Sequence, residues 1–267
     1  MTFDLGPAIL FCPADRPDRY AKAAARADAV ILDLEDAVAA GDKAAAREAL
    51  VSAPLDPAST IVRVNSVDSG FLADDLAALA RTDYRFVMLA KTENAQQVSP
   101  LSRFDVIALC ETAAGVVAAP EIAAVPWVVA LLWGAEDLVA SLGGTSSRHA
   151  DGSYRAVAAQ ARSSVLLAAG AHGTAAIDTV HVDIADLAGL AAEAQDARAS
   201  GFAATACIHP SQVTTIRDAY RPTAEEVAFA TALLAAAEGE HGVFRYDGRM
   251  VDEPVLRHAR SVLQRSL

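Results

Sequence analysis

Eight short apolar runs, each followed by a helix-forming stretch, constrain the fold of this chain more than any other feature. The runs are continuous rather than alternating in hydrophobicity, as expected for parallel strands that are buried on both faces. Helical, often alanine-rich stretches lie between them, for example 43–53, 115–124, 154–170 and 186–200. The eight runs are 8–13, 29–36, 60–65, 85–91, 105–112, 127–137, 175–183 and 204–210.

Eight strand–helix units close naturally into a (β/α)8 TIM barrel, and an open doubly wound sheet is the alternative. A chain of 267 residues that is 53% hydrophobic suits one large barrel. We therefore predict an α/β fold with a catalytic barrel over 1–220 and a C-terminal helical extension over 221–267. The extension begins where Pro222 breaks a helix and Thr223 offers an N-cap, and its last helix is expected near Pro254.

Charge and cysteine usage exclude several classes of protein. The net charge of −12 argues against a nucleic-acid partner, whose phosphates require many Lys and Arg contacts. No apolar run of about 18 residues lacks a charge, so no membrane span is expected. The N-terminus carries no basic stretch of a signal peptide. The widely spaced Cys12, Cys110 and Cys207 are typical of buried thiols in a reducing cytoplasm, with a catalytic cysteine as the alternative.

Charged residues follow strand after strand at the carboxyl end, which in a barrel opens on the face that carries the active site. Any one of them can be explained as a strand end that meets solvent or as a cap of the next helix. As a set, several carboxylates at one mouth would repel strongly unless a cation neutralised them. The set consists of Asp33, Glu35, Asp36, Arg63, Lys91, Glu111, Glu136, Asp137 and His209.

The oxygen-rich set favours a hard cation, and Mg²⁺ fits best, held by one or two carboxylates, water and substrate oxygens. The six histidines are scattered without metal-ligand spacing, so the sequence does not indicate zinc.

A basic stretch follows the first strand. Arg16, Arg19 and Lys22 recur at spacings of three around a helix start at Pro17, and three cations beside a helix N-terminus can bind phosphate. A solvated helix face explains the spacing equally well. The position beside the barrel mouth favours the phosphate site.

Seven stretches in order resemble the family of the citrate lyase β subunit and the malyl-CoA and citramalyl-CoA lyases, in the HpcH/HpaI aldolase superfamily. The resemblance spans nearly the whole chain, and no single stretch would carry it. The stretches are FCPADRPDRYAKA, ILDLEDAV, VRVN, VIALCETAAG, GAEDL, CIHPSQ and GRMVDEPVLRHA.

The resemblance implies roles for residues at the barrel mouth. Glu111 and Asp137 match the two direct Mg²⁺ ligands, and Glu35 and Asp36 match acidic residues that hold metal-bound waters. Arg63 matches the arginine that contacts the reacting oxygen of the substrate.

The resemblance also implies that Arg16, Arg19 and Lys22 hold the phosphates of CoA. Asp252 matches a carboxylate delivered from a neighbouring subunit, which implies a homotrimer or a multiple of it. From the residues alone, Asp252 reads as the start of a helix with Pro254 in its first turn.

The implied activity is Mg²⁺-dependent cleavage or formation of a β-hydroxyacyl-CoA, giving acetyl-CoA or a related acyl-CoA and a 2-oxo acid. Malyl-, citramalyl- and hydroxymethylglutaryl-type substrates differ by a methyl or methylene, worth only about 1–3 kcal/mol in a pocket. Ala90 and Ala114 stand where the family commonly has Pro and Arg, and the second change puts the choice of oxo acid in doubt.

Two other functions remain open. One is a class II pyruvate-type aldolase that works without CoA, although it would not require the basic stretch or the MVDEP segment. The other is a subunit of a multi-subunit citrate lyase that depends on an acyl carrier protein.

Overall fold

A closed barrel of eight parallel strands forms the larger part of the protein, in a computed structural model that describes residues 3–240 and 242–266. Each strand pairs with the next one in sequence, and β8 pairs with β1 to close the barrel. The predicted (β/α)8 fold is confirmed, and the open doubly wound sheet is wrong. The strands are β1 (Ala8–Pro13), β2 (Ala29–Asp33), β3 (Thr60–Val64), β4 (Phe86–Leu89), β5 (Asp105–Cys110), β6 (Val128–Trp133), β7 (Ala175–Asp178) and β8 (Ala204–Cys207).

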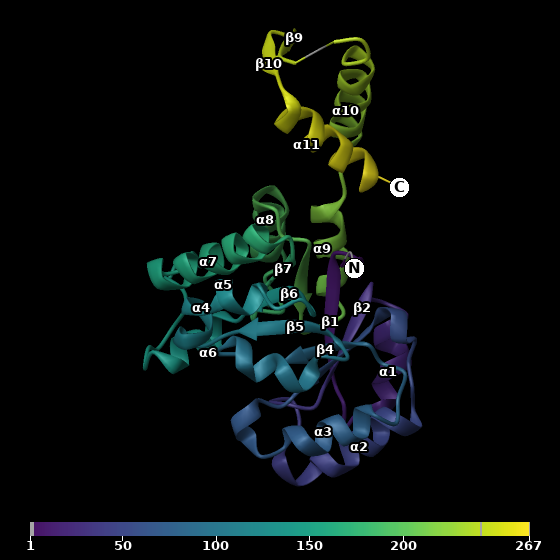
Figure 1. Ribbon diagram of the computed structural model, residues 1–267, viewed down its shortest axis with the longest axis vertical. Helices are drawn as coiled ribbons and strands as arrows, with labels where there is room; N and C mark the ends of the chain where they lie inside the picture. Colours follow the sequence, from purple (N-terminus) through teal and green to yellow (C-terminus); the bar gives the residue numbers. More distant parts are fainter. Residues whose placement is uncertain (1–2, 241, 267) are drawn as a thin grey trace. The chain divides into compact units, whose positions relative to one another are not determined.

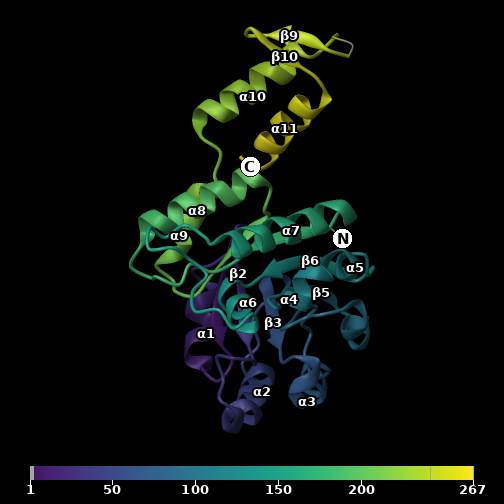
Figure 2. The same ribbon diagram turned by 90° about the vertical axis from the view of Figure 1, so that its left-hand side faces the viewer.

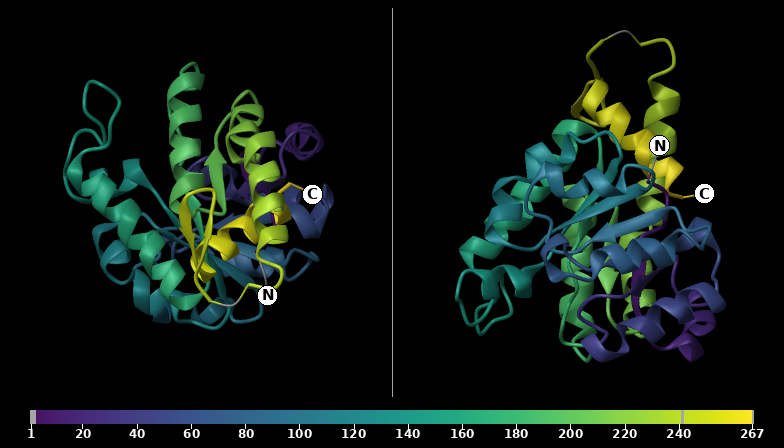
Figure 3. Two further views of the ribbon diagram at one scale, coloured as in Figure 1. Left: turned by 90° about the horizontal axis from the view of Figure 1, so that it is seen from above. Right: turned by 60° about the horizontal axis from the view of Figure 1, so that its bottom comes forward.

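Helices connect the strands and surround them in the views of Figures 1, 2 and 3. The 3-10 helix η4 (Ala95–Leu101) takes the place of an α-helix between β4 and β5. No helix of the described residues is both long and apolar enough to cross a bilayer. The α-helices of this part are α1 (Pro17–Ala24), α2 (Lys43–Ser52), α3 (Leu72–Leu79), α4 (Ala113–Val117), α5 (Ala119–Ala123), α6 (Ala135–Ser141), α7 (Ala156–His172), α8 (Leu187–Ser200) and α9 (Gln212–Tyr220).

Every strand except β1 ends earlier than its apolar run predicts. The run 127–137 divides into β6 and the helix α6, so Glu136 and Asp137 lie in the first turn of a helix and not on a strand. Gly134 is the N-cap residue between the two elements, and acidic side chains are favoured at the positive end of a helix dipole. The predicted helix 115–124 is likewise two short helices, because Pro120 cannot continue the first one.

Apolar side chains from all eight strands fill the inside of the barrel. Ile9, Ile31, Ile61, Met88 and Ile107 belong to one buried cluster together with residues of β6, β7 and β8. The barrel is therefore a packed core and not a pore, so a ligand has access only to the ends of the strands.

The chain divides into two compact units, Met1–Ala219 and Tyr220–Leu267. The second unit contains α10 (Ala224–Ala236), the hairpin strands β9 (Phe244–Tyr246) and β10 (Arg249–Val251), and α11 (Glu253–Gln264). Figure 2 shows α10 and α11 packed together with the hairpin at one end.

Local sequence explains the elements of this second unit. Thr223 and Glu226 form a reciprocal capping box at the start of α10, as the N-cap at Thr223 predicts. The turn residues Asp247 and Gly248 both have positive φ, which a tight two-residue hairpin turn requires. Leu233, Val251 and Val262 belong to a separate core, so this unit packs around its own apolar residues.

Candidate active site

A buried ion pair lies at the carboxyl ends of β2 and β3. Arg63 donates through Nε and Nη2 to the two oxygens of Asp33, at 2.7 and 2.6 Å. Burial alone would lower the pKa of Arg63, but the charge of Asp33 and its hydrogen bonds outweigh it, so the pKa lies above its usual range. The guanidinium also stacks 4.9 Å from the centre of the Phe11 ring, and the result is a permanent, fixed cation.

The loop after β2 brings two more carboxylates to the same place. The backbone N–H of Glu35 donates to Asp33 Oδ1 at 2.8 Å, and Glu35 Oε2 lies 3.2 Å from Arg63 Nη1. The backbone N–H of Asp36 in turn donates to Glu35 Oε2 at 2.9 Å. These bonds fix the buried Glu35 and the exposed Asp36 beside the arginine.

Lys91, two residues after the end of β4, contacts acidic residues from three connections of the barrel, after β2, β5 and β6. Its ammonium donates to Glu35 and, at 3.0 Å, to Asp36, and it lies 3.8 Å from an oxygen of Asp137. Its backbone N–H donates to Glu111 Oε1 at 3.0 Å. The backbone at Lys91 is left-handed, with φ of 48°, which is uncommon for a residue with a Cβ atom.

Glu111 and Asp137 share one region at the ends of β5 and β6. Burial is the main cause that raises the pKa of Glu111 to about 8, and the nearby charge of Asp137 raises it further. Gly134 makes room for this arrangement, because a Cβ there would lie 2.8 Å from Glu111 Cβ and 3.0 Å from Glu111 Oε2. Only a glycine at 134 therefore allows the Glu111 side chain to lie where it does.

This donor set fits a hard divalent cation. Glu111 and Asp137 offer carboxylate oxygens. The positive charges of Arg63 and Lys91 act on Glu111, and Asp137 lies 3.8 Å from the Lys91 ammonium. No group of three or more His, Cys, Asp or Glu side chains placed to hold a metal occurs in the described part of the chain. Two protein carboxylates with other oxygens from water and substrate are what Mg²⁺ commonly takes, whereas a closed protein cage is typical of structural zinc.

The basic stretch lies on the helix that follows β1. Arg16 occupies the N-cap position of α1, and Arg19 and Lys22 lie within the helix, all exposed. Arg16 Nε lies 3.2 Å from the exposed Asp18, and such surface pairs contribute little. The three cations therefore remain accessible to an anionic ligand.

Asp252 lies in the second unit, as the N-cap residue of α11. Its Oδ1 accepts the backbone N–H of Val255 at 3.4 Å, so the residue does cap a helix with Pro254 in its first turn. Only one carboxylate oxygen is used in this bond. Its role in catalysis stays a prediction.

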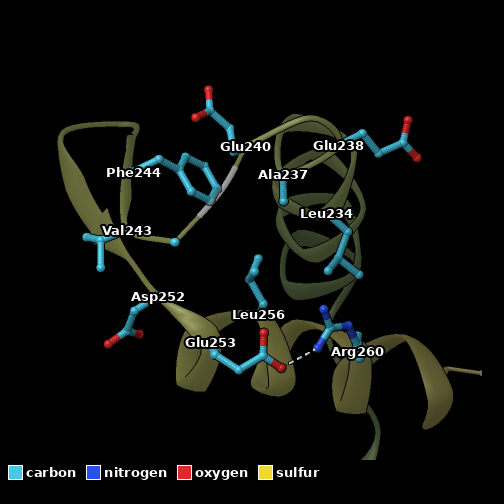
Figure 4. A pocket seen from close by; sticks show the side chains of 11 residues that line it. Leu234, Ala237, Glu238, Glu240, Val243, Phe244, Asp252, Glu253, Leu256 and Arg260 are labelled. Atoms are coloured by element: carbon cyan, nitrogen blue, oxygen red, sulfur yellow. Dashed lines mark hydrogen bonds and ion pairs between the residues drawn. The ribbon is translucent and has the colours of Figure 1, made fainter.

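Asp252 also borders a cavity of about 660 Å³ between α10, α11 and the hairpin, shown in Figure 4. Glu238, Glu240 and Glu253 line it, and the one arginine among the described lining residues, Arg260, is bonded to Glu253 at 2.7 Å. An acidic cavity repels an anionic substrate, so the barrel mouth is the better candidate site.

Two polar residues that the sequence places at strand ends, Glu136 and His209, lie apart from the cluster. Glu136 accepts a hydrogen bond of 2.6 Å from the Ser147 hydroxyl. The His209 ring contacts the Ser211 hydroxyl of its own loop at 2.7 Å. Asp33 and Lys91 belong to the charged set predicted at the barrel mouth, but neither is assigned an individual role from the sequence. The sequence signal for Asp33 is a carboxylate that ends a wholly buried strand. The signal for Lys91 is a lysine at the same face as the acidic residues that follow β2, β5 and β6.

A cysteine nucleophile does not fit the structure. Burial raises the pKa of Cys12 to about 11 and those of Cys110 and Cys207 to about 12. All three side chains are buried neutral thiols, as the sequence predicts, and neutral thiols are poor nucleophiles.

Residues 8–210 match the family described as HpcH/HpaI aldolase/citrate lyase. The citrate lyase subunit beta-like protein of Mycobacterium tuberculosis is 58% identical over 98% of this chain and 96% of its own length. The mitochondrial citramalyl-CoA lyase of Homo sapiens is 30% identical over 96% of this chain and 84% of its own length. A crystal structure of CitE from M. tuberculosis with magnesium, acetoacetate and coenzyme A superposes with a TM-score of 0.93 at 57% identity, covering 98% of both chains.

The raised pKa of Glu111 predicts a pH-dependent stability of the metal-free protein. The folded state binds this proton more tightly than the unfolded chain, so the contribution to stability is lost as pH rises from about 4.5 to about 8. Glu111→Gln has no group that titrates at this position, so its free energy of unfolding does not fall in this way. The variant should therefore become more stable relative to wild type as pH rises from about 4.5 to about 8. Each unit by which the pKa differs between the folded and unfolded states changes the free energy of unfolding by at most about 1.4 kcal/mol.

Denaturant unfolding at pH 5 and pH 8 in EDTA measures the effect, with exposed Glu121→Gln as the matched control. Saturating Mg²⁺ should remove most of the advantage of Glu111→Gln at pH 8. Parallel pH profiles of wild type and Glu111→Gln in EDTA would contradict the prediction.

Proposed function

This chain belongs to the HpcH/HpaI aldolase/citrate lyase family, and we propose that it is a Mg²⁺-dependent lyase of a β-hydroxyacyl-CoA. The observation that carries the proposal is the convergence of Glu111 and Asp137 beside the fixed Arg63 at one end of the barrel. The substrate class includes malyl-CoA, citramalyl-CoA and hydroxymethylglutaryl-type CoA. The products are acetyl-CoA, or a related acyl-CoA, and a 2-oxo acid, and the reaction can run in either direction.

Relatives with the same fold support the CoA part of the proposal. The M. tuberculosis structure contains coenzyme A and acetoacetate, and the human relative is named for a CoA ester. In this chain Arg16, Arg19 and Lys22 would meet the phosphates of CoA beside the start of α1. Binding energy from this remote part of the substrate can be used at the reacting carbon atoms.

Glu111 and Asp137 would hold Mg²⁺, with Glu35 and Asp36 ordering its waters. When bound, the ion supplies a Lewis acid and a template for substrate oxygens. The M. tuberculosis relative has been crystallised with magnesium, which supports the same cofactor here.

Arg63 would stabilise negative charge on the reacting oxygen. Asp33 accepts two of its five N–H hydrogens and leaves others for the substrate. Because Asp33 and Phe11 fix the guanidinium, no reorganisation is needed as charge develops.

The bond that breaks joins the hydroxyl-bearing carbon to the carbon next to the thioester. The hydroxyl loses its hydrogen as the 2-oxo acid forms, and the carbon next to the thioester gains one, so the proton count balances. Asp252 would exchange the proton with that carbon, from a neighbouring subunit of a homotrimer or its multiple. Its second carboxylate oxygen is not used in capping α11.

Loss of either metal ligand should abolish the cleavage. Glu111→Gln and Asp137→Asn should each lower kcat/KM by at least about a hundredfold, since metal coordination contributes several kcal/mol to the transition state. The measurement is release of acetyl-CoA from a panel of acyl-CoA esters, with Mg²⁺ or with EDTA. Glu136→Gln, one residue from Asp137 but bonded to Ser147, is the matched control. Full activity of wild type in EDTA would refute the metal role.

Loss of the basic stretch should affect substrates with CoA alone. Arg16→Ala with Arg19→Ala should raise KM for the acyl-CoA about tenfold or more with little change in kcat, because both residues contact only the remote phosphates. A CoA-free hydroxy-oxo acid should react as before, and Arg26→Ala, exposed beyond the end of α1, should change neither. Equal losses on both substrates would favour the CoA-independent aldolase. Activity on carrier-bound substrate alone would favour the citrate lyase subunit.

Complementation tests the transfer of Asp252 between subunits. Arg63→Ala and Asp252→Ala should each be inactive, and their co-expression should restore part of the activity, because some mixed sites would receive both native residues. Light scattering on the same samples gives the oligomeric state. No recovery from mixed oligomers, or a fully active monomer, would contradict delivery from a neighbour.

A further inference from the structure

We propose that Lys91 is the resident counter-cation of the acidic site, defined as Glu35, Asp36, Glu111 and Asp137. In this role Lys91 keeps the four carboxylates together when no divalent ion is bound, and it opposes the binding of that ion. The inference rests on the proposed metal site, but it concerns Lys91, which has no role in the proposed function.

The contacts of Lys91 reach every member of the acidic site. The ammonium bonds to Glu35 and to Asp36 and lies 3.8 Å from Asp137 Oδ1, while the backbone N–H donates to Glu111. These carboxylates come from three separate connections of the barrel, after β2, β5 and β6. Lys91 therefore joins acidic residues that share no hydrogen bond across these connections in the described contacts.

The backbone of Lys91 is built for this double contact. Its left-handed φ of 48° turns the N–H toward Glu111 Oε1 at 3.0 Å while the side chain extends to the loop after β2. A residue with a Cβ atom adopts this conformation only where the surroundings hold it there. Glycine would take the same backbone conformation without penalty, which separates the role of the backbone from that of the ammonium.

The local charge balance shows why a cation is needed. With Asp33 included, five carboxyl groups face two cations, Arg63 and Lys91. Asp33 already holds Arg63 through two hydrogen bonds. Glu35 and Glu111 are buried, and a buried carboxylate without a partner is strongly destabilising. In the described ion pairs, Lys91 is the only cation that contacts Asp36 and Asp137. Without it the carboxyl groups of the metal-free site would still repel one another, and these two would have no cation beside them.

A counter-cation differs from a structural support in its effect on Mg²⁺. An ammonium close to a proposed ligand repels the incoming ion, so its removal should tighten Mg²⁺ binding although the metal-free protein becomes less stable. A support that merely shapes the site would, when removed, weaken both.

The test is Lys91→Met, which keeps most of the length of the unbranched side chain and removes its charge. Thermal unfolding in EDTA should show a Tm lower by several degrees, and saturating Mg²⁺ should recover most of that loss. Calorimetric titration with MgCl₂ alone should give a Kd at least about threefold lower than that of wild type. Lys91→Gly should tighten Mg²⁺ binding in the same way, and Lys91→Arg should resemble wild type.

Lys43→Met is the matched control. The Lys43 ammonium donates to the backbone carbonyls of Leu34 and Glu35, at 2.7 and 3.0 Å, so it supports the same loop without a hydrogen bond to a carboxylate. This variant should lose equal stability in EDTA and in Mg²⁺, with no tightening of Mg²⁺ binding.

The proposal is overturned if Lys91→Met binds Mg²⁺ as wild type or more weakly, or if its loss of Tm is equal in EDTA and in Mg²⁺. Failure of the proposed function has a different signature, since wild type itself would then bind no Mg²⁺ or cleave no acyl-CoA. The stability measured in EDTA tests Lys91 in either case, because unchanged stability of Lys91→Met there also overturns the role.

Discussion

The paired hydrogen bonds between Asp33 and Arg63 determine how the rest of the barrel mouth is arranged. The two residues are register partners on adjacent strands, so the parallel pairing of β2 with β3 places carboxylate and guanidinium side by side. Asp33 also accepts the backbone N–H of Glu35 and thereby directs the following loop toward the site. A buried ion pair of this kind contributes orientation more than stability, because the cost of desolvation offsets much of its attraction.

The sequence predicts the fold well because the relevant physics is local. Continuous apolar runs of this length are the signature of strands buried on both faces, and eight of them leave few ways to close a sheet. The same rule explains why the candidate site could be located. Strands that run parallel end on one face, so charged residues at the carboxyl ends of β2 and β3 and after β5 and β6 had to meet there whatever the details of packing.

Other features depend on contacts that a single sequence does not reveal. The apolar run through Trp133 continues past Gly134 without an obvious break, so the start of α6 and the helical position of Asp137 were missed. The importance of Lys91 depends on a left-handed backbone, which is not typical of lysine. Asp252 caps α11 in the structure, and capping alone explains the sequence pattern around it, so the pattern does not reveal a catalytic role.

Gly134 shows how the absence of a Cβ atom at one position limits the substitutions that the site can accept. The space that a methyl group would need is taken by Glu111, with 2.8 Å to its Cβ. Evolution or protein engineering can therefore enlarge side chains at the barrel mouth only where no carboxyl side chain packs against the backbone, as Glu111 does at Gly134. A redesign of the pocket for bulkier ligands has to begin at other connections of the barrel, because position 134 accepts glycine alone.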